Sequence, residues 1–118
     1  MVARSNSGAD IPDVGDVVWL TLDPQKGHEQ AGRRPALVLS PAEYNEKTSL
    51  AIVCPITSQP KGYPFEVAIL GNQNVAGAVL SDQVKSLDWR ERNALRKGRV
   101  SSGVIDQVCE NIGKLIGL

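Results

Sequence analysis

The strongest constraint on the fold is a series of short apolar or alternating segments, separated by turn residues and followed by one amphipathic helix. Segments of this length with intervening Gly, Pro and Asn are typical of β-strands. The predicted strands are 16–22, 36–39, 50–54, 65–70, 76–80 and 84–87. Apolar residues recur at helical spacing between Val104 and Ile116. Ser101 or Ser102 can cap the start of this helix, and Gly117 follows its end. This order predicts a mainly β fold with a C-terminal helix, in which a strongly bent sheet forms a small or partly open barrel.

The chain has the size of one domain. Its 118 residues suffice for a single core, and 42% apolar with 22% charged residues is the composition of a globular protein. Aromatic residues make up only 4%, so Val, Ile and Leu must fill the core, which favours strands. Residues 1–12 are polar and are expected to be disordered, whereas 13–118 form the single folded domain. Ser40 as a cap, with Pro41 after it, predicts one helical turn between the second and third predicted strands.

The sequence carries no pattern that indicates a metal site or a membrane segment. Cys54 and Cys109 lack metal-ligand spacing and are interpreted as reduced residues of the core. Asp13, Asp16 and Asp23 flank the first strand without the spacing of a magnesium site, so solvation at the surface is the better account. We therefore expect no metal and no cofactor. Because no segment has the length of a membrane span or the composition of a secretory signal, we expect a cytoplasmic protein without membrane contact.

Positive charge is concentrated in one segment, although the chain as a whole is neutral. Thirteen Lys and Arg balance 13 Asp and Glu, so the net charge gives no reason to expect a polyanionic partner. The segment 90–99, however, holds several basic residues against a single acid, Glu91. Either a phosphate backbone docks on this segment, or it is a solvated basic turn.

Two polar segments beside apolar strands are candidates for chemistry. The polar connection after the first strand runs for about a dozen residues, which is long for a compact domain, and such loops often carry function. Pro35 restricts Arg34 to an extended conformation, where its guanidinium either grips a phosphate or forms an ion pair with Glu29. Thr57 and Ser58 follow an apolar strand and either donate hydroxyl hydrogens to phosphate oxygens or end the strand in an ordinary turn.

Three stretches resemble the MazF/PemK toxins in matching order and spacing, namely GDVVWLTLDPQKGHEQAGRRPALVLSPAEYN, CPITSQPKGYPFEV and LSDQVKSLDWR. They occupy residues 15–45, 54–67 and 80–90, which is nearly the whole chain. The resemblance implies an SH3-like barrel of the CcdB/MazF-like toxin fold, a homodimer, and a toxin of a type II toxin–antitoxin system with a MazE-like antitoxin as its partner. It also implies a sequence-specific endoribonuclease that cleaves single-stranded mRNA without a metal and so inhibits translation and growth. The RNA's own 2′-hydroxyl would be the nucleophile, leaving a 2′,3′-cyclic phosphate and a 5′-hydroxyl.

The resemblance assigns catalytic roles to Arg34, Thr57 and Glu29. Attack by the 2′-oxygen builds negative charge on the phosphorane, and donors from Arg34 and Thr57 would stabilise it, each by about 10²- to 10³-fold in rate. Glu29, or water that it holds, would share the proton transfer. The residues implied to contact RNA are His28, Gln30, Arg33, Ser58, Gln59, Lys61, Gln83, Lys85 and Arg90.

The sequence departs from the family's pattern at a few positions, and two other functions stay open. Ser58 stands where a second threonine is usual, and neither Arg33 nor His28 is a family requirement, so the cleavage motif is affected more than the activity. One alternative is a CcdB-like gyrase poison, a toxin that would not cleave RNA. The other is a non-catalytic barrel that binds nucleic acid through residues 90–99, which would retard RNA without producing new ends.

Overall fold

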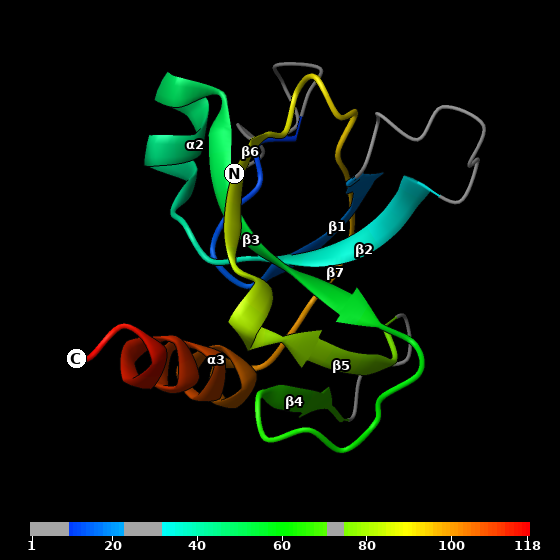
Figure 1. Ribbon diagram of the computed structural model, residues 1–118. Coiled ribbons are helices and arrows are strands. Elements are labelled where there is room, and N and C mark those ends of the chain that lie inside the picture. The colour runs from blue at the N-terminus through cyan, green and yellow to red at the C-terminus, as the bar shows by residue number, and fades with distance from the viewer. Residues whose placement is uncertain (1–9, 23–31, 71–74) are drawn as a thin grey trace.

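The computed structural model describes residues 10–22, 32–70 and 75–118 (Figure 1). Its elements in chain order are β1 (Asp16–Thr21), β2 (Arg33–Val38), α2 (Ala42–Thr48), β3 (Leu50–Thr57), β4 (Glu66–Ile69), β5 (Gly77–Leu80), the short 3-10 helix η2 (Ser81–Gln83), β6 (Lys85–Asp88), β7 (Leu95–Arg99) and α3 (Ser102–Leu115). The predicted mainly β fold with a C-terminal helix is confirmed. Within the described ranges, no helix is long and apolar enough to cross a membrane.

Strand β3 lies at the centre of the sheet. It pairs with β2 through Leu37 and Cys54, with β6 along its first part, and with β5 at its last two residues, where Thr57 faces Ala78. All of these pairs are antiparallel, and the strand order is β4, β5, β3, β2, β1, β7. Because β3 exchanges one set of partners for another along its length, the sheet bends strongly there, as Figure 1 shows. The result is a half-barrel, which is compatible with the SH3-like barrel implied by the resemblance.

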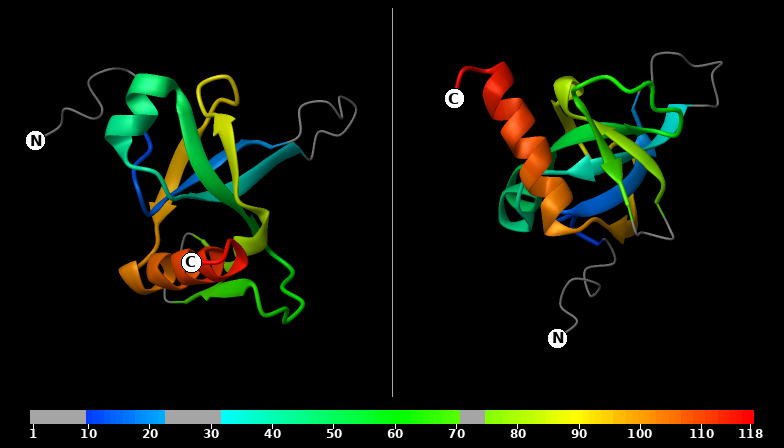
Figure 2. Two further views of the ribbon diagram at one scale, coloured as in Figure 1. Left: turned by 60° about the vertical axis from the view of Figure 1, so that its left-hand side comes forward. Right: turned by 90° about the horizontal axis from the view of Figure 1, so that it is seen from below.

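Apolar side chains form two core clusters on opposite faces of the bent sheet. In β1, Val17 belongs to the first cluster, whereas Val18 and Leu20 belong to the second, and all three are almost fully buried. Helix α3 covers the first cluster with Val104 and Val108 and lies beside β4 and η2 (Figure 2). Successive residues of a strand point to opposite faces, so the consecutive apolar residues Val17 and Val18 bury β1 on both faces.

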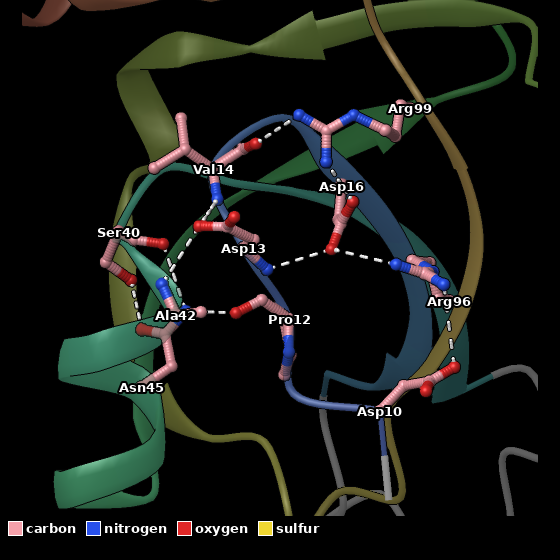
Figure 3. A network of polar contacts seen from close by, with 10 residues as sticks. All are labelled: Asp10, Pro12, Asp13, Val14, Asp16, Ser40, Ala42, Asn45, Arg96 and Arg99. Carbon is pink, nitrogen blue, oxygen red and sulfur yellow. Dashed lines mark hydrogen bonds and ion pairs between the residues drawn. The ribbon is translucent and has the colours of Figure 1, made fainter. Parts of the chain in front are cut away.

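The carboxylate of Asp16 organises the start of β1 (Figure 3). It is fully buried and accepts hydrogen bonds from Nη1 of Arg99 at 2.6 Å and from the backbone N–H of Asp13 at 2.8 Å. The guanidinium of Arg96 lies 3.9 Å away. Asp13 in turn accepts a hydrogen bond from the backbone N–H of Ala42, at the start of α2. The expectation that these aspartates are solvated at the surface is therefore wrong for Asp16, whose burial requires its arginine partners.

The segment between β2 and β3 forms a longer helix than the single turn predicted. Helix α2 covers seven residues, and Pro41 rather than Ser40 occupies its N-cap position. The Ser40 hydroxyl instead donates to Oδ1 of Asn45 at 2.6 Å and accepts from the backbone N–H of Ile52 at 2.9 Å. Asp13, distant in sequence, supplies the acceptor for the first helical N–H. The prediction that Ser40 caps this helix is wrong because Ser40 connects α2 to β3.

The structure also bears on the expectations for the basic segment 90–99, the two cysteines and the N-terminal residues. Strand β7 was not predicted, and it lies within the basic segment that was interpreted as a turn or a phosphate dock. Cys54 is buried as predicted, but Cys109 is exposed on α3, so its assignment to the core is wrong. The pKa of the Cys54 thiol is raised to about 12, mainly by burial and to a smaller extent by the nearby Cys109 and Asp82. Residues 1–9, most of the segment expected to be disordered, lie outside the described residues.

Candidate active site

Arg34 lies near the start of β2 with an exposed side chain. Pro35 follows it and the two residues form extended strand, as the sequence predicted. Among the described residues, none forms a hydrogen bond or ion pair with the Arg34 guanidinium. As far as the described residues go, its planar set of N–H donors is open to an anion. Glu29, His28 and Gln30, which the sequence analysis placed in the same site, lie outside the described residues.

Thr57 is the last residue of β3, the strand that pairs with β2. That pairing ends at Ala36 and Pro55, and Thr57 itself pairs with Ala78 of β5. Figure 1 shows these two strand ends diverging on one side of the molecule. Arg34 and Thr57 therefore lie at neighbouring strand ends, one at the start of β2 and the other at the end of β3.

The Thr57 hydroxyl has a defined orientation. Its oxygen accepts a hydrogen bond from the backbone N–H of Gln59 at 3.1 Å, which is an ordinary turn contact. A hydroxyl that accepts in this way keeps its own hydrogen for donation. The turn interpretation of Thr57 is confirmed, and donation to a phosphate oxygen stays a prediction with which this contact is compatible.

The backbone of Thr57 rests directly on Gly77 of β5. Gly77 has φ of 118°, a conformation that other residues rarely adopt. A Cβ at this position would overlap the Thr57 carbonyl oxygen and would lie 3.0 Å from its carbonyl carbon. The absence of a side chain at Gly77 thus sets how closely β5 approaches the end of β3.

A pocket of about 280 Å³ lies beside Thr57. One wall consists of alternate residues along the chain: Thr57, Gln59, Lys61, Tyr63 and Phe65, with Glu66 after them. The other wall comes from the end of β5 and from η2: Leu80, Asp82 and Gln83. Of these residues, the sequence predicted Thr57, Gln59, Lys61 and Gln83 but not the others. The alternation of long side chains with Pro and Gly in the QPKGYPFE stretch was the available signal. Ser58 and Lys85 are exposed and do not line the pocket.

Two of the arginines expected to contact RNA make contacts within the protein. The guanidinium of Arg33 donates to three backbone carbonyls, those of Arg92, Asn93 and Trp19, at 3.0 to 3.1 Å. Arg90 stacks on the ring of Trp89, 4.3 Å from its centroid. It follows β6 at the end that pairs with the start of β3, about 20 Å along that strand from Thr57. Arg33 therefore connects β2 to the β6–β7 turn, and Arg90 lies apart from the pocket.

The basic segment 90–99 has fewer free donors than its sequence suggests. Arg92 donates to the carbonyls of Thr21 and Leu22, and both Arg96 and Arg99 pair with the buried carboxylate of β1. These contacts hold the segment against the sheet. It is thus mainly a structural element, formed by β7 and the turn before it.

Comparison with known proteins gives a consistent result. A family model described as PemK-like, MazF-like toxin of type II toxin–antitoxin system matches residues 13–116. The chain is 50% identical to the endoribonuclease toxin MazF of Escherichia coli K12 over 107 residues, which is 91% of this chain and 96% of that protein. It is 31% identical to the endoribonuclease PemK of Escherichia coli, over 86% of this chain and 80% of that protein.

Solved structures agree in fold. The crystal structure of MazF from Deinococcus radiodurans matches with a TM-score of 0.84 and 51% identity, covering 92% of this chain and 98% of that one. A crystal structure of MazE–MazF from Deinococcus radiodurans matches with a TM-score of 0.81 and 45% identity, covering 92% and 97%.

Proposed function

The chain belongs to the PemK-like, MazF-like toxins of type II toxin–antitoxin systems, as an endoribonuclease, and we propose that it cleaves single-stranded RNA between Arg34 and Thr57 without a metal ion. The observation that carries the proposal is the placement of these two side chains. A guanidinium without a partner among the described residues lies near the start of β2, and the Thr57 hydroxyl, which accepts a backbone hydrogen bond, ends β3, the strand that pairs with β2. Two donors that converge on one anion match the charge of a phosphodiester.

The proposed reaction is the one that the resemblance to the MazF/PemK toxins implies, and these donors suit it. The 2′-oxygen of the nucleotide before the cut attacks phosphorus, the P–O5′ bond breaks, and the products carry a 2′,3′-cyclic phosphate and a 5′-hydroxyl. Arg34 and Thr57 donate to the non-bridging oxygens, whose negative charge grows in the transition state. A guanidinium has no acceptor and keeps its charge in proteins, so Glu29, or water held by it, takes the 2′-hydroxyl proton. The departing 5′-oxygen receives a proton from water.

The pocket beside Thr57 supports a role in holding RNA next to the cut. Tyr63 and Phe65 offer rings on which a base can stack, and Lys61 supplies positive charge for the backbone. Gln59 and Gln83 can donate to and accept from base edges. Base edges are accessible only in unpaired RNA, so duplex RNA should resist cleavage.

The proposal extends to partners and location. MazF of Deinococcus radiodurans assembles with MazE, and we assign a MazE-like antitoxin and a homodimer to this chain as well. Exposed Trp19 and Leu95 lie opposite one another on β1 and β7, which gives an apolar area of the kind that partners cover. The place of action is the cytoplasm, where mRNA is translated. One domain, 13–118, carries the activity.

A mutational series tests the proposal on single-stranded RNA. Arg34→Ala and Thr57→Ala should each lose about 10²-fold or more in turnover because a charge-stabilising donor is missing. Arg34→Lys keeps the charge but lacks the planar fork, so a bidentate contact predicts a large loss there too. His28→Ala should retain most of the turnover, and each variant is first checked for intact fold by its melting temperature. Loss of cleavage in folded His28→Ala, with activity retained in Arg34→Ala, would sink the assignment.

A further inference from the structure

We propose that Glu66 is a positioning residue of the RNA-cleaving site, because its carboxylate holds the β3–β4 loop (residues 58–65) in the shape that Thr57 and the pocket require. The inference rests on the proposed function. It adds a role for a side chain that reaches neither the phosphate-binding guanidinium nor the nucleophile, and that acts through the backbone of this loop.

The β3–β4 loop needs a contact that fixes it. All of its residues are exposed, it bends at residues 58–59 and turns at 64–65, and alternate residues along it line the pocket. No strand pairs with it in the described sheet, so it lacks the ladder of hydrogen bonds that normally holds an extended segment. Gly62, with φ of 84° and open space around its Cα, adds conformational freedom. Exposed segments with few contacts open readily.

The carboxylate of Glu66 supplies this contact. Both of its oxygens accept from the backbone N–H of Lys61, at 3.1 and 3.0 Å, and one also accepts from Gly62 at 2.8 Å. The backbone N–H of Glu66 itself donates to the carbonyl of Tyr63 at 3.1 Å. Hydrogen bonds to an ionised acceptor are stronger than those between neutral groups. The middle of the loop is thus folded back onto the first residue of β4.

Both ends of the loop are attached to the site. At one end, the backbone N–H of Gln59 donates to the Thr57 hydroxyl oxygen at 3.1 Å. At the other end, the hydroxyl and the backbone N–H of Ser81 in η2 donate to the carbonyl of Phe65. A shift of the middle of the loop must therefore change the orientation of the Thr57 hydroxyl or the width of the pocket.

Removal of the Glu66 carboxylate should change RNA cleavage in opposite directions for a positioning role and for a purely electrostatic role. Glu66 places negative charge beside a site for a polyanion, so its removal should strengthen RNA binding if charge alone mattered. A positioning role predicts slower cleavage in spite of the lost repulsion. The loss should appear in kcat, because the misplaced hydroxyl acts in the transition state.

The experiment measures kcat and KM on single-stranded RNA for the wild type, Glu66→Ala, Glu66→Gln and two matched variants. Glu66→Ala should lose about 10²-fold in kcat, the scale expected for a displacement of about 1 Å. Glu66→Gln keeps an acceptor oxygen in the same place and should restore at least half of that loss on a logarithmic scale. Gly62→Ala leaves the charge unchanged but strains the loop, and should lower kcat in the same direction. Glu110→Ala, which removes an equal charge from α3, should match the wild type.

Backbone amide exchange is the second readout. In Glu66→Ala the N–H groups of Lys61 and Gly62 should exchange faster, while those of β3 stay protected. Wild-type kcat in Glu66→Ala, or unchanged exchange at Lys61 and Gly62, would overturn the inference alone. If Glu66→Ala does not fold, the same two readouts on Glu66→Gln and Gly62→Ala decide. Failure of the wild type to cleave RNA would overturn the proposed function, and the inference with it.

Discussion

Gly77→Ala should damage cleavage through a movement of the Thr57 backbone. The new Cβ would overlap the Thr57 carbonyl oxygen and lie 3.0 Å from its carbonyl carbon and 3.4 Å from the Cα of Ser58. Ordinary contacts of a carbon atom are about 3.5–4.0 Å, so relief of the overlap with the Thr57 oxygen requires β5 and the end of β3 to separate by about 1 Å or more. All three contacts are to backbone, so no side chain can move aside to relieve them.

The expected loss is large in rate and moderate in stability. A displacement of about 1 Å at a catalytic group can cost about 10²-fold in turnover. A side chain at φ of 118° adds strain of about 1–3 kcal/mol, which lowers the melting temperature. Steady-state cleavage of single-stranded RNA and thermal unfolding measure the two effects separately.

Gly117→Ala is the matched control for this prediction. Gly117 also has positive φ, at 85°, but a Cβ there meets nothing within 4 Å. This variant should be slightly less stable and should cleave at the wild-type rate. If Gly77→Ala cleaves within about threefold of the wild type, the idea that β5 positions Thr57 is refuted.

Three further predictions concern stability and reactivity. Arg99→Ala leaves the buried carboxylate of β1 without its closest cation and should destabilise the fold by about 3 kcal/mol, measured by denaturant unfolding; a change below about 1 kcal/mol would contradict the network. Hydrogen bonding, chiefly from the backbone of Glu91, lowers the pKa of Asp88 in the folded protein. The ionised carboxylate therefore stabilises the fold fully at pH values above its pKa in the unfolded chain, about 3.9, and this stabilisation is lost as the pH falls through the folded pKa. Asp88→Asn should therefore lower the melting temperature at pH 7 and flatten its acid dependence. Because burial raises the pKa of Cys54 to about 12, iodoacetamide at pH 8 should modify the exposed Cys109 alone in the native protein, as peptide mass spectrometry would show; equal labelling of both would be inconsistent with a buried thiol.

The strands that the sequence predicted are those whose residues alternate or form apolar runs. Val17 to Leu20 in β1 is the clearest case, because each face of the strand meets its own core cluster. Strand β7 carries no such pattern, since basic residues fill it. It forms because β1 offers a partner edge and because Arg99 reaches the buried Asp16. A strand that depends on such distant contacts has no signature in its own residues.

In the candidate site, too, the sequence predicted residues that belong to recognisable stretches but not contacts between residues that it does not place together. Arg34 and Thr57 were named from the resemblance, and they lie near the start of β2 and at the end of β3, two strands that pair with each other. The role of Arg33 was not predictable, because its carbonyl partners are 14, 59 and 60 residues away. Glu66 was missed for a related reason. Its carboxylate acts on backbone N–H groups of the preceding loop, and residue types alone do not reveal such a contact.

The chemistry of the cut ends tests the central claim most directly. Purified protein is incubated in excess EDTA with a single-stranded RNA, and with the same RNA carrying one 2′-deoxyribose immediately 5′ to the cleavage site. The account predicts full cleavage of the first substrate, with 5′-hydroxyl and 2′,3′-cyclic phosphate ends, and none of the second, because the 2′-hydroxyl is the nucleophile. A requirement for magnesium, 5′-phosphate ends, or cleavage of the deoxy-substituted RNA would contradict a site that works through Arg34 and Thr57 on the RNA's own nucleophile.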